Sequence, residues 1–349
     1  MPLFVLTIKY HKMKCLFYVL FLVLFVSPDS YAQTNDATLP ELKEAYLKKR
    51  TKFMDSSTKK FSDVEQTELN GILDQIEGNG PESFEYYLIS YVHSNYNLDL
   101  KENLFKAYTL NSTDKTVVSE MLGYYIMTEN LVKQKEFVQK TQKNYTAAEL
   151  AYYQDAMPTG NVVLITANQE DMYAFLGLKM LSGIGAEVSL VNLDFLKNST
   201  YKKSISTFAG ITDANFLGAE SSYIKTLISG STKKVFVSTT VSQAYLSNVE
   251  DKMYLTGLTY QYGAGNQRTL LDNFWTMMKT KDLSKFVLSK SSEKNLYGNY
   301  LPPLLTLYKL KLSEGTEDIV LANTIKIIAE KIGKKEVVDD ILYQYLNDE

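Results

Sequence analysis

The sequence is poor in the residues that most often carry catalysis or bind metals. Its 349 residues include one cysteine, Cys15, and two histidines, of which only His93 lies beyond the first 32 residues. A lone cysteine excludes an internal disulfide and a cysteine metal site. A histidine zinc site or a serine–histidine pair would depend on His93 alone. Because His93 lies beside tyrosines in a predicted helix, we expect a packed or half-exposed imidazole and no metal site.

Motifs that cradle phosphates or expose a nucleophile are missing as well. The chain has no Gly-Lys-Ser/Thr phosphate loop and no Gly-x-Ser-x-Gly elbow. Gly183 and Gly185 precede a predicted strand, whereas dinucleotide-binding glycines follow one, so this pair indicates the end of a helix. The sequence therefore predicts no cofactor and favours a non-catalytic role, and the enzyme question stays open.

The first 32 residues have the features of a secretory signal peptide. An apolar run from Cys15 to Val26 follows three lysines and precedes the small-residue signal Ser30-Tyr31-Ala32. We expect cleavage near Ala32 and translation from either Met1 or Met13. The prediction is an exported protein, periplasmic or secreted.

Long hydrophobic runs are absent after this leader. None approaches the roughly 20 residues of a spanning helix, so we expect no stable membrane span after cleavage. The mature chain would have 317 residues (349 minus 32), with 34 basic (37 minus 3) and 39 acidic (40 minus 1) side chains, a formal charge of −5. Nothing in this balance indicates nucleic acid binding. An exported chain without disulfides is typical of the bacterial cell envelope.

Three short apolar runs carry the strand signal. They span residues 161–167, 186–192 and 233–239, and helical periodicity separates them. Runs rich in Val and Ile are typical of strands buried on both faces of a helix-covered parallel sheet. We predict an α/β domain over residues 158–265, with a right-handed crossover and a further edge strand within residues 253–262.

Helices are predicted on both sides of that domain. Ser62-x-x-Glu65 and Thr146-x-x-Glu149 are capping boxes in residues 33–157, and residues 266–349 form a helical tail. Residues 104–125, with Asp114 as a helix cap, resemble one helix–turn–helix unit of tetratricopeptide repeats. The predicted fold class is α/β, a small mainly parallel sheet with flanking helices, a tetratricopeptide-like region before it and a helical tail after it.

Several of these segments together resemble one known family. They are residues 162–173, 187–196, 234–239 and 255–260, with Tyr201 and Asn299-Tyr300-Leu301. The block is similar to the soluble C-terminal region of multi-pass membrane proteins related to transmembrane protein O-mannosyltransferases. The resemblance covers roughly residues 100–345. Glu187-Val188 stands where that family usually has Asp-Val at the second strand.

The resemblance implies an accessory role rather than glycosyl transfer. In that family the chemistry is expected in the membrane-embedded half, which this sequence lacks. The implied protein is an exported, stand-alone copy of the accessory domain that binds something rather than transforming it. A grafted function on the same fold stays open.

Polar side chains follow each predicted strand. We call six of them the strand-end cluster: Asn168, Glu170, Asp171, Asn192, Asp194 and Thr239. Because ligands of open α/β sheets bind at the carboxyl ends of strands, this cluster is the candidate ligand site. Asn168 and Asp171 also suit the start of a helix, as cap and first-turn acid, so capping and binding both stay open.

Three functions remain after these exclusions. The first is an envelope interaction protein that docks a protein partner. The second is a small-ligand or glycan-binding module that uses the strand-end cluster. The third is a glycan-active enzyme that uses two of its carboxylates, which would then lie about 5 to 10 Å apart. We favour the first.

Overall fold

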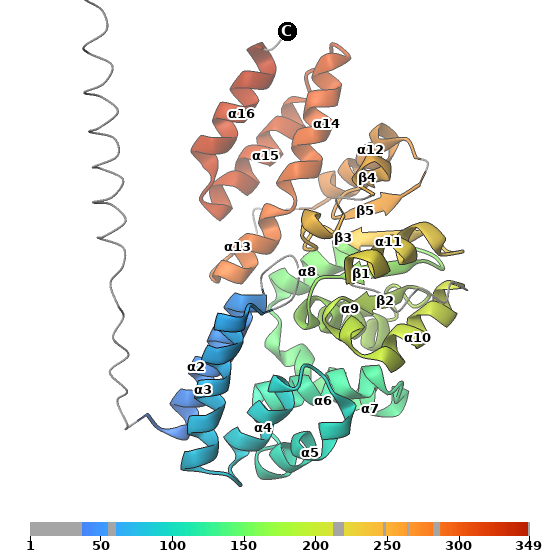
Figure 1. Ribbon diagram of the computed structural model, residues 1–349. Helices are drawn as coiled ribbons and strands as arrows, with labels where there is room; N and C mark the ends of the chain where they lie inside the picture. The colour runs from blue at the N-terminus through green and yellow to red at the C-terminus, as the bar shows by residue number, and fades with distance from the viewer. Residues whose placement is uncertain are drawn as a thin grey trace, which may run out of the picture.

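The chain folds around a small sheet that is covered by helices (Figure 1). The computed structural model describes residues 37–54, 61–211, 220–246, 249–263, 265–281 and 287–347. The predicted signal peptide lies outside these residues. None of the helices within them is long and apolar enough to cross a bilayer.

The sheet has five strands in the order β2-β1-β3-β5-β4. Their bounds are β1 Val163–Thr166, β2 Ser189–Asn192, β3 Val235–Ser238, β4 Met253–Leu255 and β5 Thr259–Tyr262. β1 pairs in parallel with both β2 and β3, whereas β5 pairs antiparallel with β3 and β4. The three predicted parallel strands are therefore present, but the sheet is mixed and not mainly parallel.

The difference arises in the predicted edge strand at residues 253–262. It is a hairpin, β4 and β5, because the chain reverses at Gly257. Gly257 has φ +131°, which L side chains rarely adopt, and a Cβ there would lie 2.5 Å from the ring of Phe274. Only glycine fits that turn without displacing Phe274. The hairpin adds the antiparallel half of the sheet.

Helices precede, connect and follow the strands. Before the sheet lie α2 Leu39–Met54, α3 Asp63–Asn79, α4 Phe84–His93, α5 Lys101–Leu110, α6 Lys115–Met127, α7 Leu131–Thr141 and α8 Ala147–Ala156. Between strands lie α9 Gln169–Ser182, α10 Ser199–Ala209 and α11 Glu220–Gly230. After them lie α12 Gln267–Lys279, α13 Ser291–Gly298, α14 Leu301–Ser313, α15 Ile319–Ile332 and α16 Lys335–Asn347.

Local sequence signals account for many helix ends. Both predicted capping boxes are formed, at Ser62 before α3 and at Thr146 before α8. Asp114 caps α6 by accepting from two backbone N–H groups. Gly183 ends α9 in the left-handed conformation, which confirms that it terminates a helix.

The sheet is the middle layer of the molecule. Val163 and Ile165 of β1 face a core shared with α2 to α7, whereas Leu164 faces a core shared with α12 to α16. This alternation is expected of a strand buried on both faces, where successive side chains point in opposite directions. Each core joins residues from both sides of residue 158, and the division into domains stays a prediction.

Candidate functional site

The strand-end cluster is made largely of side chains with structural partners. Asn168 follows β1, and its Oδ1 accepts the backbone N–H of Asp171 at 2.9 Å. This bond satisfies one of the free N–H groups at the start of α9. Capping by Asn168, which the sequence left open beside ligand binding, is thus observed.

Asp171 joins three elements. It is 3% exposed, and its Oδ1 accepts from Tyr153 Oη at 2.6 Å while its Oδ2 accepts from Thr240 Oγ1 at 2.7 Å. Tyr153 belongs to α8 and Thr240 follows β3. A buried carboxylate that accepts from both hydroxyls satisfies each of its oxygens. Burial and the adjacent Asp171 raise the pKa of Tyr153 far above the usual value for tyrosine.

The cluster residues after β2 are also held internally. Asn192 is fully buried, and its Oδ1 accepts the N–H groups of Asp194 and Phe195 at 2.8 and 3.2 Å. Its Nδ2 lies 3.4 Å from Thr166 Oγ1 at the end of β1. Asp194 is buried at 7% exposure. These contacts join the carboxyl ends of β1 and β2.

Thr239 and Glu170 complete the cluster in different ways. Thr239 Oγ1 donates to the carbonyl of Leu258 at 3.1 Å and lies 3.2 Å from Tyr152 Oη. Glu170 has an exposed side chain, and its backbone carbonyl accepts from Tyr145 Oη at 2.7 Å. The strand ends do converge, as the sequence predicts. Tyrosines of α8 occupy that crevice, and a ligand-binding role for the six residues stays a prediction.

A second polar group, which the sequence analysis missed, lies between the N-terminal helices and the strand ends. Gln169 Nε2 donates to Tyr96 Oη at 2.6 Å, and the Arg50 guanidinium lies 5.6 Å from the centroid of the Tyr96 ring. Arg50 also donates to Asn95 Oδ1 at 3.3 Å. We call Arg50, Tyr91, Tyr96, Glu120 and Gln169 the interlayer network. Its members come from α2, α4 and the residues after it, α6 and α9.

Some polar atoms in the interlayer network are buried without a hydrogen-bond partner. They are Arg50 Nε, Tyr91 Oη and Glu120 Oε2. Burial raises the pKa of Glu120 to about 7, although Arg50 and a hydrogen bond from Gln169 oppose the shift, and Asp194 adds to it. Tyr96 and Asn95 both have positive φ, at 67° and 52°, a conformation that costs energy in residues other than glycine.

The described residues offer no metal site. Among them, no three His, Cys, Asp or Glu side chains lie where they could hold a metal ion. His93 accepts or donates at Nδ1 with Tyr46 Oη at 2.8 Å, and burial, with Arg50 nearby, lowers its pKa. His93 is therefore a half-buried, hydrogen-bonded side chain.

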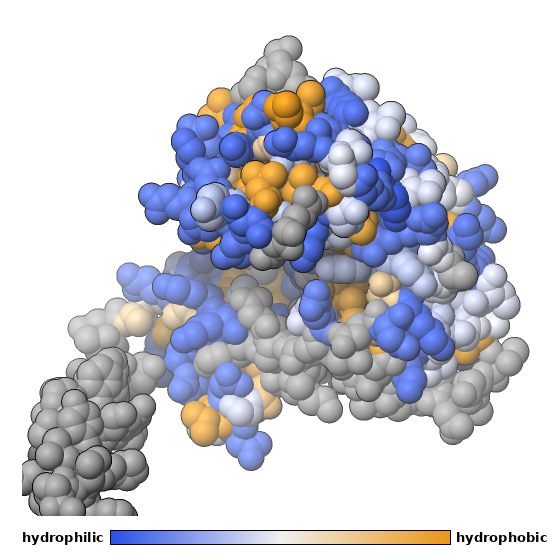
Figure 2. All heavy atoms as spheres, turned by 90° about the horizontal axis from the view of Figure 1, so that it is seen from above, coloured by the Kyte–Doolittle hydropathy of each residue, from blue (hydrophilic) through white to orange (hydrophobic). Residues whose placement is uncertain are grey.

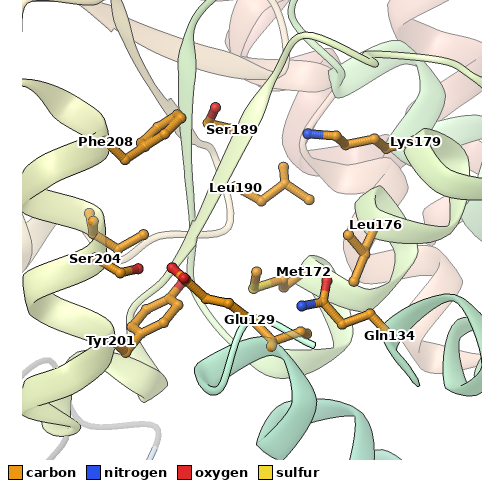
Figure 3. A pocket seen from close by; sticks show the side chains of 12 residues that line it. Glu129, Gln134, Met172, Leu176, Lys179, Ser189, Leu190, Tyr201, Ser204 and Phe208 are labelled. Atoms are coloured by element: carbon orange, nitrogen blue, oxygen red, sulfur yellow. The ribbon is translucent and has the colours of Figure 1, made fainter. Parts of the chain in front are cut away.

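An open cavity lies against the free edge of β2, the outermost strand of the sheet. Figure 3 shows this strand between side chains of α9 and α10. The cavity measures about 220 Å³. Its lining is Ile126, Glu129, Gln134, Met172, Leu176, Lys179, Ser189, Leu190, Tyr201, Ser204, Ile205 and Phe208. We call this hollow the β2 groove. A second hollow of about 470 Å³ continues it along α10, because the two share Glu129, Ser204 and Phe208.

The backbone of Leu190 faces the β2 groove. Ser189 and Leu193 donate their N–H groups to the carbonyls of Val162 and Thr166. The backbone N–H groups of these two residues therefore point toward β1. Alternate residues of a strand point their backbone groups to opposite sides. Leu190 and Asn192 therefore point away from β1, toward the free edge.

Side chains close this edge at both ends. Lys179 Nζ donates to the Val188 carbonyl at 2.6 Å, and Asn192 donates its N–H to Tyr201 Oη at 3.1 Å. Leu190 lies between these two bonds and lines the cavity, and its N–H and carbonyl point toward the free edge. No hydrogen bond of the described residues involves either group. One residue of an unpaired strand edge is thus open to a partner.

The C-terminal helices expose apolar side chains of their own. Figure 2, seen from that side, shows apolar side chains scattered among hydrophilic ones. Those of α15 and α16 are Ile319, Val320, Ile327, Val337, Tyr343 and Leu346. Scattered apolar residues are ordinary on protein surfaces. They do not define a site.

No protein family, curated protein or solved structure matches the chain.

Proposed function

We propose that this protein is an exported, non-catalytic interaction protein of the bacterial envelope, and that it docks an extended peptide segment of its partner on the free edge of β2. The observation that carries this proposal is the open backbone of Leu190 at the floor of the β2 groove. A peptide that adds a strand there would gain the two hydrogen bonds that Leu190 leaves unmade.

The lining of the groove combines polar and apolar side chains, as an extended peptide would require. Met172, Leu176, Ile205 and Phe208 give it an apolar wall. Leu131 and Val132, which come two and three residues after Glu129 of the lining, are 67% and 81% exposed. Backbone pairing supplies affinity and an apolar pocket supplies side-chain selectivity in strand addition.

The proposal includes two expectations from the sequence. The helix pair α5–α6 is tetratricopeptide-like, and the chain is a stand-alone relative of the accessory region of the O-mannosyltransferase-related family. Both favour binding over catalysis. Export after cleavage near Ala32 belongs to the same proposal.

The glycan-binding alternative keeps one supporting observation. Arg50 Nε, Tyr91 Oη and Glu120 Oε2 are buried without partners in the interlayer network, and a ligand hydroxyl donates once and accepts twice. The strand-end cluster itself supports this alternative less, because the buried side-chain oxygens of Asp171 and Asn192 already accept internal bonds. A panel of sugars and sugar nucleotides in thermal unfolding tests it, since a ligand at 100 times its Kd stabilises by about 2.7 kcal/mol.

Peptide binding to the full-length chain tests the main proposal. The probes are fluorescein-labelled hexapeptides of alternating threonine and valine with one leucine or phenylalanine, followed by fluorescence anisotropy. Methylating one backbone nitrogen at a time should weaken binding at least severalfold at the position opposite Leu190, because a hydrogen bond contributes about 0.5–1.5 kcal/mol. Equal binding by every methylated peptide would overturn strand addition.

A groove-filling variant locates the site. Ser204→Arg places a long side chain in the β2 groove and should weaken binding by at least about tenfold, or about 1.4 kcal/mol. Ser229→Arg is the matched control, because Ser229 is exposed on α11. If both variants bind equally well, the peptide binds elsewhere.

A further inference from the structure

Two lysines lie at the amino-terminal end of the β2 groove. Lys179 Nζ contacts the Val188 carbonyl, and Lys233 Nζ lies 3.7 Å from the centroid of the Phe208 ring, which lines the cavity. Burial, and secondly the charge of Lys233, lowers the pKa of Lys179. The Lys233 ammonium group is therefore close enough to act on Lys179.

No carboxylate of the described residues forms a salt bridge with either lysine. A half-buried ammonium whose single recorded bond is to a backbone carbonyl has donor capacity left, since –NH₃⁺ carries three N–H groups. Within the described part of the chain, this end of the groove thus carries two ammonium groups without a salt-bridged carboxylate. A ligand that brings a carboxylate would complement it.

The position of Lys179 restricts where that carboxylate lies in the ligand. Val188 lies two residues before Leu190, so its carbonyl also points away from β1, in the plane of the sheet. Lys179 Nζ binds this carbonyl and so occupies the place where an added strand would continue. Side chains of an added strand project above and below this plane. A carboxylate that meets Lys179 in the plane belongs to the backbone, at the point where the strand ends.

We propose that the β2 groove recognises the free C-terminus of a partner protein. The terminal segment pairs antiparallel to β2, so that its chain runs from the Tyr201 end toward the Lys179 end. The penultimate residue then lies opposite Leu190 and exchanges two hydrogen bonds with it. The α-carboxylate meets Lys179, with Lys233 adding to the local charge.

The cavity supplies the second element of recognition. Its wall around Leu190 is formed by Leu176 and Met172 on one side and by Phe208 on the other (Figure 3). A leucine- or phenylalanine-sized side chain near the terminus would bury apolar surface there, at roughly 25 cal/mol per Å². The inferred ligand is an extended C-terminal segment with one large apolar residue among its last three. This inference rests on the proposed function.

The test compares matched hexapeptides on the full-length chain by fluorescence anisotropy. All carry fluorescein at the N-terminus, alternating threonine and valine, and a leucine in the last three positions. One ends in a free acid, one in an amide, and one is amidated with an internal aspartate. We expect the free acid to bind at least about tenfold more tightly than both others, because a hydrogen-bonded ion pair contributes more than a neutral bond.

Variants connect that preference with the lysine. Lys179→Met keeps the length of the side chain and removes the charge, so it should reduce the preference for the acid to near one. Lys225→Met, at an exposed lysine of α11, is the control and should keep the full preference. Circular dichroism and thermal unfolding show whether each variant is folded.

Each outcome decides between the two claims. Equal binding by acid and amide, with sensitivity to backbone methylation, would overturn recognition of a terminus and leave strand addition standing. Tightest binding by the internal aspartate peptide would do the same. Failure of every peptide to bind would overturn the proposed function, and the present inference with it.

Discussion

The carboxyl ends of the strands and the free edge of β2 differ in how their polar groups are bonded. At the carboxyl ends of the strands, polar side chains are plentiful, and those of Asp171 and Asn192 accept hydrogen bonds within the fold. Asp171 accepts from Tyr153 and Thr240, and Asn192 caps the turn after β2. At the free edge of β2, charged side chains are few among the lining residues, and the backbone of Leu190 is open. Unmade hydrogen bonds, rather than the number of polar residues, mark the candidate site here.

The largest expected effect tests whether Asp171 is structural. Asp171→Ala removes the acceptor for two hydroxyls and leaves a buried void, so we expect about 3 kcal/mol of lost stability, at 1.5–3 kcal/mol for each hydrogen bond to a charged group. Urea unfolding measures it. Thr240→Val, which removes one of the two donors, should cost less.

A different result for Asp171→Ala would reverse the comparison. If the variant kept its stability and lost binding of a sugar or nucleotide, the strand ends would be the ligand site. The interaction proposal would then lose its main contrast.

The next largest expected effect is a pH dependence of stability that arises from Glu120 in the interlayer network. The folded pKa of Glu120 is raised from 4.5 to about 7, so the folded chain holds more protons than the unfolded chain between these values. Its contribution to stability is greatest below pH 4.5, falls as the pH rises from 4.5 to 7, and is constant above. Glu120→Gln mimics the protonated carboxyl and should be more stable than the parent by about 3 kcal/mol at pH 8, at about 1.36 kcal/mol for each unit of pKa difference.

The measurement is urea unfolding of both proteins at pH 5 and pH 8. The groups that face Glu120 are Arg50 of α2, Tyr91 of α4, Gln169 of α9, and Tyr96 and Asp194 in connecting segments. The advantage of Glu120→Gln should nearly vanish at pH 5. A constant difference at both pH values would show that Glu120 ionises normally.

Local sequence signals predicted the parts of the fold that local physics determines. The parallel strands follow from apolar runs rich in Val and Ile, and the starts of α3 and α8 follow from capping boxes at Ser62 and Thr146. The strand-end cluster was located, because strand ends converge in any parallel sheet. Its internal partners Tyr152 and Tyr153 belong to α8, before the predicted α/β domain, and their pairing with Thr239 and Asp171 was not predicted.

Long-range pairing explains what sequence reasoning missed. The interlayer network joins Arg50, Tyr96, Glu120 and Gln169, which lie far apart along the chain. One signal was present, since Glu120 follows Val117 by three residues and so lies on the buried face of α6. The open edge of β2 depends on strand order, which a run of apolar residues does not encode. The hairpin was missed because Gly257 splits the predicted edge strand.

The smallest effect sharpens the comparison at the β2 edge itself. Tyr201→Phe removes the hydroxyl that accepts the N–H of Asn192, and a buried N–H without a partner costs about 1–3 kcal/mol. We expect a loss near 1 kcal/mol, because the free edge gives that N–H access to water from the groove.

Phe208→Leu, a change in the same wall without a polar group, is the control for packing. Hydrogen exchange at Asn192 should quicken in Tyr201→Phe and stay unchanged in Phe208→Leu. If the Asn192 amide stayed protected without the tyrosine, another group would close the edge, and the peptide could not pair along it beyond Leu190.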